Sequence, residues 1–179
     1  MMMKSVKRAM SFGFAASALS VMLMVAGGAS MANAASKSPF PKLKGSWKCV
    51  RGGCWIRPVG GARERVGCRV RYKVGSGGKT IRQAINCRGS IKMTANARVS
   101  MKSNGRVSGS WTSYNNHTGR VSGGASGTAN SRKLFVGVTS RKGYRGAMRA
   151  VVSGKRHTVT LYQNKNGKRK IVGRLSLKR

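Results

Sequence analysis

The sequence predicts an all-β protein: an antiparallel meander of about eight to ten short strands, closed into a small barrel or folded into a sandwich. Three observations predict it. Apolar and polar residues alternate with a period of two through much of the chain, as they do in half-buried strands. Turns rich in Gly, Asn and Ser interrupt this alternation at short intervals. Beyond the first 34 residues, no segment shows the apolar periodicity of a helix.

Residues 1–34 have the parts of a secretory signal peptide. A positively charged start with Lys4, Lys7 and Arg8 is followed by an apolar stretch and by Ala-Asn-Ala at 32–34, an A-x-A cleavage pattern. The apolar stretch is broken by Ser and Gly and is shorter than a membrane-spanning helix needs. We therefore expect cleavage after this pattern, and a periplasmic or secreted product that is not an integral membrane protein.

The rest of the chain is expected to form one domain. Residues 35–44 contain Pro39 and Pro41, which oppose regular structure, and they are expected to be a flexible lead. Residues 45–179 have a length that suits a single hydrophobic core. They are expected to form the basic β domain.

The clearest hairpin joins strands expected over 66–74 and 80–88. A two-residue turn at Gly77-Gly78 sets a register in which every inward residue of one strand faces an inward residue of the other. Cys68 then faces Cys87 as a hydrogen-bonded pair, with Cα atoms about 5.5 Å apart. That separation is within disulfide reach, so the register predicts a Cys68–Cys87 disulfide.

A second hairpin is expected between strands over 91–101 and 106–114. Only a three-residue loop with Gly105 in the left-handed conformation keeps the apolar faces in phase, and it places Met101 opposite Val107. Interior glycines, which are costly in strands, indicate sharp coiling or bulges at barrel corners. The other strands expected cover 46–57, 118–128, 134–139, 144–152, 156–163 and 170–177. The interior glycines are Gly109, Gly119, Gly123, Gly127, Gly137 and Gly146.

The four cysteines, an even number, are typical of an oxidising compartment. Cys49 and Cys54 are expected to pair, because the segment between them is short and Gly-rich enough to turn back. A four-thiolate zinc site is a weaker alternative, since export favours disulfides. No metal and no cofactor are expected.

The sequence is poorly supplied with catalytic groups. Glu64 is its only acidic residue, which excludes paired-carboxylate glycosidase chemistry and leaves no Asp for a Ser-His-Asp triad. His117 and His157 suggest ribonuclease-like acid–base catalysis, but their spacing does not aim them at one another. The protein is therefore expected not to be an enzyme, with a two-histidine nuclease as a minor alternative.

Charge is the strongest functional indication. The chain has 37 Lys and Arg residues and a formal net charge of +36. Such self-repulsion is relieved by an anionic partner, so we expect broad electrostatic binding of anionic polymers or surfaces: lipopolysaccharide, acidic glycan, anionic lipid or nucleic acid. The residues expected to bind are a ladder on the outward strand faces, Arg65, Arg69, Arg71, Lys73, Arg82 and Arg88, and a basic segment near the C-terminus, Lys165, Lys168, Arg169 and Lys170.

The span from Glu64 to Val74, with Gly77-Gly78 and the segment 81–87, resembles a group of small exported bacterial β proteins of unknown function. Ser46-Trp47 and the Arg-Val-Ser-Gly segments at 106–109 and 120–123 match further features of that group. The resemblance implies a Gly/Ser/Arg-rich β domain with one cysteine pair, Cys68 and Cys87, and it implies no activity.

Two other functions fit the strand pattern. A lipocalin-like barrel can hold one small ligand in its interior, which makes a carrier the main alternative. A membrane-embedded barrel would place the Arg and Lys face inside a narrow lumen, where so many like charges repel strongly. The pattern leaves open whether the basic C-terminal segment closes the fold or forms an edge.

Overall fold

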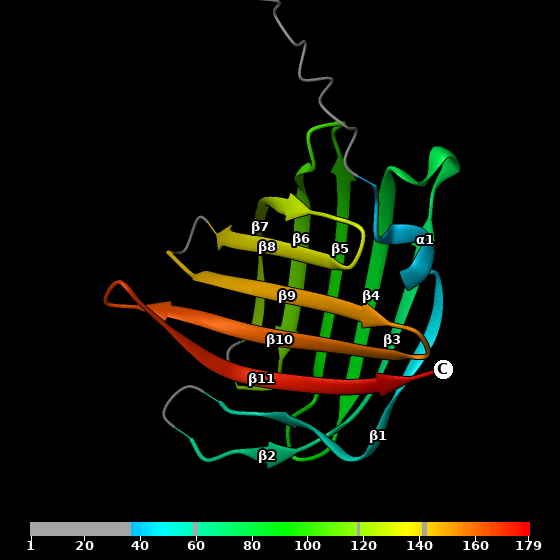
Figure 1. Cartoon of the computed structure of the whole chain (residues 1–179). Helices are drawn as coiled ribbons and strands as arrows, with labels where there is room; N and C mark the ends of the chain where they lie inside the picture. Colours follow the sequence, from blue (N-terminus) through cyan, green and yellow to red (C-terminus); the bar gives the residue numbers. More distant parts are fainter. Residues whose placement is uncertain (1–36, 59–60, 118, 141–142) are drawn as a thin grey trace, which may run out of the picture. The chain divides into compact units, whose positions relative to one another are not determined.

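The computed structural model describes residues 37–179 except 59–60, 118 and 141–142. The signal peptide predicted over 1–34 therefore lies outside the described residues. The described chain forms a closed antiparallel barrel of ten strands plus one extra strand (Figure 1). In order, the strands are β1 (Gly45–Ile56), β2 (Glu64–Arg65), β3 (Gly67–Val74), β4 (Thr80–Arg88), β5 (Met93–Met101), β6 (Arg106–Asn115), β7 (Gly119–Ala129), β8 (Lys133–Ser140), β9 (Arg145–Ser153), β10 (Arg156–Lys165) and β11 (Lys168–Lys178).

The strands follow one another around the barrel in chain order, from β3 to β11, and β1 lies between β11 and β3. The short strand β2 pairs only with the end of β1. Each strand expected from the alternation is present, and the architecture is a barrel and not a sandwich. The C-terminal segment closes this barrel, because β11 pairs with β10 on one side and with β1 on the other.

The β3–β4 hairpin has the predicted register but a different turn. Cys68 faces Cys87 and Val74 faces Ile81, as the inward faces require. The last hydrogen-bonded pair before the turn is Gly75 with Thr80, in which the N–H of Gly75 donates to the carbonyl of Thr80. The turn between them therefore has four residues, and it includes the 3-10 segment η1 (Ser76–Gly78). The predicted hydrogen-bonded pairing of the cysteines is therefore wrong. They are a non-hydrogen-bonded pair with Cα atoms 4.0 Å apart.

The β5–β6 hairpin has the predicted register and turn. Met101 faces Val107, Ala97 faces Trp111, and Gly105 has a φ of 77°, in the left-handed region. A residue with a Cβ atom would be strained at this φ, which explains the glycine.

Glycines mark the places where the sheet bends over itself. Strands β8–β11 cross in front of β3–β6 at a steep angle in Figure 1. A Cβ atom at Gly109, Gly123 or Gly127 would collide with the backbone of the neighbouring strand. The expectation of sharp coiling at interior glycines holds at these three positions.

One end of the barrel is covered by a short helix, α1 (Phe40–Leu43), in the segment expected to be a flexible lead. That expectation is wrong because Phe40 and Leu43 are fully buried and hold the segment in place. Proline is accepted in the first turn of a helix, where the backbone N–H needs no partner. Arg179, next to β11, donates hydrogen bonds to the carbonyls of Lys42 and Lys44 at 2.6 and 3.0 Å, which ties the C-terminus to α1.

The interior of the described barrel is mostly apolar, and it contains one hydrogen-bonded chain of side chains. Gln83 Nε2 and His157 Nε2 each lie 2.8 Å from the Tyr72 hydroxyl, and His157 Nδ1 lies 3.0 Å from the carbonyl of Val151. A carbonyl only accepts, so Nδ1 carries the hydrogen and Nε2 accepts from Tyr72. Burial lowers the pKa of His157, which keeps it neutral. Among the described residues, no helix is long and apolar enough to cross a membrane.

Replacing Gly127 with Ala should destabilise the barrel by about 1–3 kcal/mol, because the new Cβ would lie 2.9 Å from the carbonyl carbon of Phe135 and 3.0 Å from Val136 Cα. Gly124→Ala is the matched control on the same strand, since its nearest atom is 3.9 Å away. Urea unfolding of the two variants measures the difference. Equal stability of the two variants would contradict the close approach of the β7 and β8 backbones at Gly127.

Removing residues 165–179 should prevent folding, because it deletes the strand that joins β10 to β1 and exposes two sheet edges. Near-ultraviolet circular dichroism should show loss of tertiary structure. As a control, Lys168→Gln with Lys170→Gln in the full chain removes charge and keeps the strand, and it should fold. A folded truncated protein would show that closure is dispensable.

Stability should fall as the pH drops below about 6.5, the ordinary His pKa in the unfolded chain. Burial lowers the pKa of His157 in the folded state below this value. As the pH falls, the histidine of the unfolded state is therefore protonated first, which favours unfolding, whereas well above pH 6.5 the contribution of His157 to stability is fully present. Urea midpoints across about pH 5 to 8 should show this loss, and His117→Gln should retain it. With one carboxylate side chain in the sequence, few other groups titrate there. A flat profile would contradict a buried neutral His157.

Candidate anion-binding groove

The outer face of β3, β4 and β5 carries a dense group of cations. Alternation in β3 turns Cys68, Val70 and Tyr72 into the barrel, so Arg69, Arg71 and Lys73 face outward and are exposed. Residues of the same face are spaced about 6.6–7 Å apart along a strand. The ladder predicted from the sequence is therefore present on β3.

The sheet register sets these cations side by side. Lys73 faces Arg82, and Arg82 in turn faces Arg98, which makes one row of cations across three strands. A second pair comes from β1, where Lys48 faces Arg69. Side chains directly opposite each other in a sheet have Cβ atoms about 4.5–5.5 Å apart, close enough for like charges to repel.

Between the rows the surface is hollowed. Ala84 lies between Arg71 and Asn96, and its methyl group leaves a depression among longer side chains. Two hollows, of 600 and 420 Å³, share Arg71 and Ala84. We call the combined depression the basic groove and define it by its seven cations: Lys48, Arg69, Arg71, Lys73, Arg82, Arg88 and Arg98.

Polar groups without charge complete the basic groove. Asn86 lines the larger hollow, and Asn96, Ser110 and Thr112 line the smaller one. Guanidinium and ammonium groups donate hydrogen bonds, and the amides and hydroxyls add further donors. The basic groove can therefore neutralise several anionic oxygen atoms at once.

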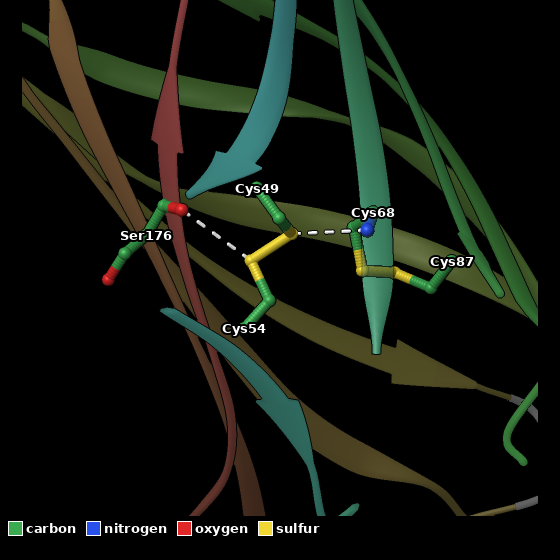
Figure 2. Close-up of a disulfide and its surroundings, with 5 residues drawn as sticks. All are labelled: Cys49, Cys54, Cys68, Cys87 and Ser176. Atoms are coloured by element: carbon green, nitrogen blue, oxygen red, sulfur yellow. Dashed lines mark hydrogen bonds between the residues drawn. A yellow bond between two sulfur atoms is a disulfide. The ribbon is translucent and has the colours of Figure 1, made fainter. Parts of the chain in front are cut away.

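Cys49 and Cys68 line the larger hollow of the basic groove, and each forms a disulfide (Figure 2). Cys68 is bonded to Cys87 and Cys49 to Cys54, as predicted, so the thiolates of a zinc site are not available. The N–H of Cys68 donates to Cys49 Sγ at 3.1 Å, which links the two bridges. Cys54 Sγ lies 3.5 Å from the carbonyl oxygen of Ser176; a disulfide sulfur has no hydrogen, so this is a van der Waals contact between β1 and β11.

The Cys49–Cys54 disulfide also shapes β1. The pairing of β1 with β11 shifts between Cys49 and Cys54, and the residues between them bulge out of the sheet. Gly52 in this bulge has a φ of 68°, which favours glycine. The bridge closes the bulge and fixes the direction of β1 beside Lys48.

Some predicted cations lie elsewhere. Arg65 is exposed on β2, paired with Trp55, and does not line the basic groove. Arg169 stacks over Phe135, 4.9 Å from the ring centre. Lys168 and Lys170 are exposed near the β10–β11 turn, at the far left of Figure 1 from β3 and β4, and the side chain of Lys165 lies outside the described residues. The structure thus brings together five of the ten predicted cations, Arg69, Arg71, Lys73, Arg82 and Arg88.

Two cations of the basic groove were not predicted. Arg98 alternates outward in its strand, and the register of β5 against β4 places it next to Arg82; carrying the predicted hairpin register one strand further would have found it. Lys48 comes from β1, which pairs with β3 across a long connection. No local pattern signals that pairing.

The remaining titratable side chains form no shared site. His157 is 1% exposed inside the barrel, whereas His117 is exposed after β6. The two histidines of the nuclease alternative are thus not presented together to a substrate. Glu64 accepts a hydrogen bond from the Ser90 hydroxyl near β2, and it does not line the basic groove.

The basic groove thus combines exposed cations, uncharged donors and a hollow floor on a rigid sheet. These properties fit an extended anion better than a single small one. No protein-family model matches this sequence, and no curated protein matches it.

Proposed function

We propose that this protein is a periplasmic or secreted, non-enzymatic β-barrel that binds anionic polymers or surfaces through the basic groove. The partner is a chain or array of phosphate, sulfate or carboxylate groups, as in lipopolysaccharide, acidic glycan, anionic lipid or nucleic acid. The binding site proposed here consists of the seven cations of the basic groove, which lie on β1, β3, β4 and β5.

The row Lys73, Arg82 and Arg98 is the observation that carries the proposal. Like charges directly opposite in a sheet destabilise the fold, and stable surfaces normally mix both signs. This row places three cations in register on adjacent strands, with a further cation pair, Lys48 and Arg69, on the same face. An anionic partner would offset this repulsion.

The shape of the basic groove supports a polymer as partner. Its hollows are depressions on a sheet face and are lined mostly by exposed residues. Cations repeating along and across strands make successive contacts with a repeating anion, and each contact is weak on a solvated surface. Such contacts recognise charge and spacing more than the identity of a base or sugar.

The cysteines support an exported location. Both cysteine pairs are at bonding distance, which is compatible with an oxidising, exported location. Outside the cytoplasm the polyanions within reach include envelope lipids and glycans. The signal peptide predicted over 1–34 supports the same location.

Binding to a single-stranded DNA oligonucleotide and to heparin, measured by fluorescence anisotropy, should weaken steeply with salt. For DNA, log affinity should fall linearly with log salt by about 0.7–0.9 per phosphate contacted, so six contacts would cost on the order of a thousandfold between 50 and 200 mM. The variant Arg71→Gln/Arg82→Gln/Arg98→Gln should reduce this slope by about 2.

The control Arg132→Gln/Lys155→Gln/Lys168→Gln removes the same charge from exposed positions outside the basic groove. It should lower affinity less and keep the slope. If the two triple variants behave alike, net charge and not the basic groove determines binding. If affinity does not change with salt, the proposed function is wrong.

A further inference from the structure

The barrel encloses a cavity whose chemistry is opposite to that of the basic groove. Its volume is about 200 Å³, and its walls are mostly aliphatic and aromatic. Residues on its walls include Ile81, Ile85, Met93, Val136, Trp111 and Leu161. This binding site goes beyond the proposed function, because no cation of the basic groove lines it.

The cavity is closed at one end and reaches the surface at the other. Around the closed end, Phe40 and Leu43 of α1 and the ring of Trp47 are fully buried. At the opposite end the lining continues to Arg57 after β1 and His117 after β6, both exposed. A small molecule can therefore enter between the strand ends.

Gln83 is a buried polar group on the cavity wall, and its hydrogen bonds have a fixed direction. His157 Nε2 accepts from the Tyr72 hydroxyl, so the Tyr72 oxygen accepts from Gln83 Nε2 at 2.8 Å. The second Nε2 hydrogen points to the sulfur of Met148 at 3.4 Å. Both N–H groups of the amide are therefore in use.

The carbonyl oxygen of Gln83 is left to the cavity. All hydrogen bonds that the described structure gives this side chain use Nε2. In the described part of the chain, no buried side-chain oxygen or nitrogen lacks a partner, so Oε1 has accessible surface. Gln83 is only 7% exposed and alternates inward on β4 with Ile81 and Ile85, so we assign the accessible surface of Oε1 to the cavity, although Gln83 also borders the smaller outer hollow.

Volume and polarity define the class of ligand. A cavity of about 150 Å³ lined by apolar side chains holds benzene, so 200 Å³ suits a molecule of about eight heavy atoms and excludes a diacyl lipid. At Gln83 the wall offers an acceptor and no free donor. A carboxylate there would meet the Oε1 lone pairs without compensation, whereas a hydroxyl or N–H would donate to them.

We propose that the barrel binds one uncharged, largely apolar molecule of about eight heavy atoms, whose single hydroxyl or N–H group donates to Gln83 Oε1. Trp111 and Tyr144, with ring centres 5.6 Å apart, both line the cavity and offer aromatic faces to such a ligand.

The test uses three related aromatic probes, 4-methylphenol, toluene and 4-methylbenzoate, titrated into the purified protein by calorimetry. We expect 4-methylphenol to bind about two- to tenfold more tightly than toluene, the effect of one hydrogen bond, and 4-methylbenzoate to bind most weakly. Gln83→Leu should abolish the preference for 4-methylphenol and keep toluene binding. Ala95→Phe should block both neutral probes, because Ala95 lines the cavity and faces Ile85 across the sheet.

A second measurement avoids dependence on the folding of the variants. In the unsubstituted protein, 4-methylphenol should shift the NMR signals of the Gln83 side-chain amide and the Trp111 indole, and 4-methylbenzoate should not. Absence of saturable binding by both neutral probes, or tightest binding by 4-methylbenzoate, would overturn the proposal. The triple variant of the basic groove should bind 4-methylphenol unchanged, which separates failure of this site from failure of polyanion binding.

Discussion

The pairing of the first barrel strand with the last is the interaction on which the rest of the structure depends. Lys48 faces Lys178 and Trp55 faces Arg174, although these residues stand at opposite ends of the domain sequence. Without this pairing β1 and β11 would be open edges, and the interior would face water. The pairing also brings Arg179 to α1, where its guanidinium lies 4.5 Å from the centre of the Trp47 ring. The pairing of β1 with β11 thus closes the sheet and also positions Arg179 against the residues that cover one end of the barrel.

Strict alternation along β4 separates two surfaces of opposite chemistry by the thickness of one sheet. Arg82 and Ala84 belong to the basic groove outside, while Gln83 and Ile85 line the cavity inside. In the two proposals, the outer surface attracts anions and the inner one excludes them. A polymer outside and a ligand inside would meet different cations, although Gln83, Asn96, Ala97 and Trp111 line both the smaller hollow and the cavity. This arrangement needs an apolar interior, because the chain has almost no acid with which to neutralise a buried cation.

Most of the fold was predictable, because period-two alternation and turn residues are local signals. The register that places Cys68 opposite Cys87 and the left-handed Gly105 both followed from matching inward faces. Whether the two cysteines form a hydrogen-bonded or a non-hydrogen-bonded pair did not follow from the inward faces. It depends on whether Gly75 or Ser76 closes the turn, and both are compatible with the same register. The helix α1 was missed because four residues carry no periodicity, and Phe40 is ordered only by tertiary burial.

The site was predictable only in part for a related reason. Outward cations on one hairpin follow from alternation, but Lys48 joins them through the long-range pairing of β1 with β3. The hollow at Ala84 was equally invisible, since a small residue becomes a depression only when its cross-strand neighbours are known. Whether the basic C-terminal segment closes the fold could not be predicted, because its charge pattern does not reveal that the following residues pair with β1.

Closure by the final strand has a consequence for how the chain matures. Synthesis proceeds from the N-terminus, so β1 and β3–β10 exist before β11 is available to complete the ring. During that interval the chain carries unpaired strand edges, which are templates for aggregation. Lys48 on β1 and Arg156 on β10 lie on the two strands that wait for β11, and cations on an edge repel another copy of the same chain. The high positive charge would then act as an internal safeguard, keeping incomplete chains apart until the last residues arrive.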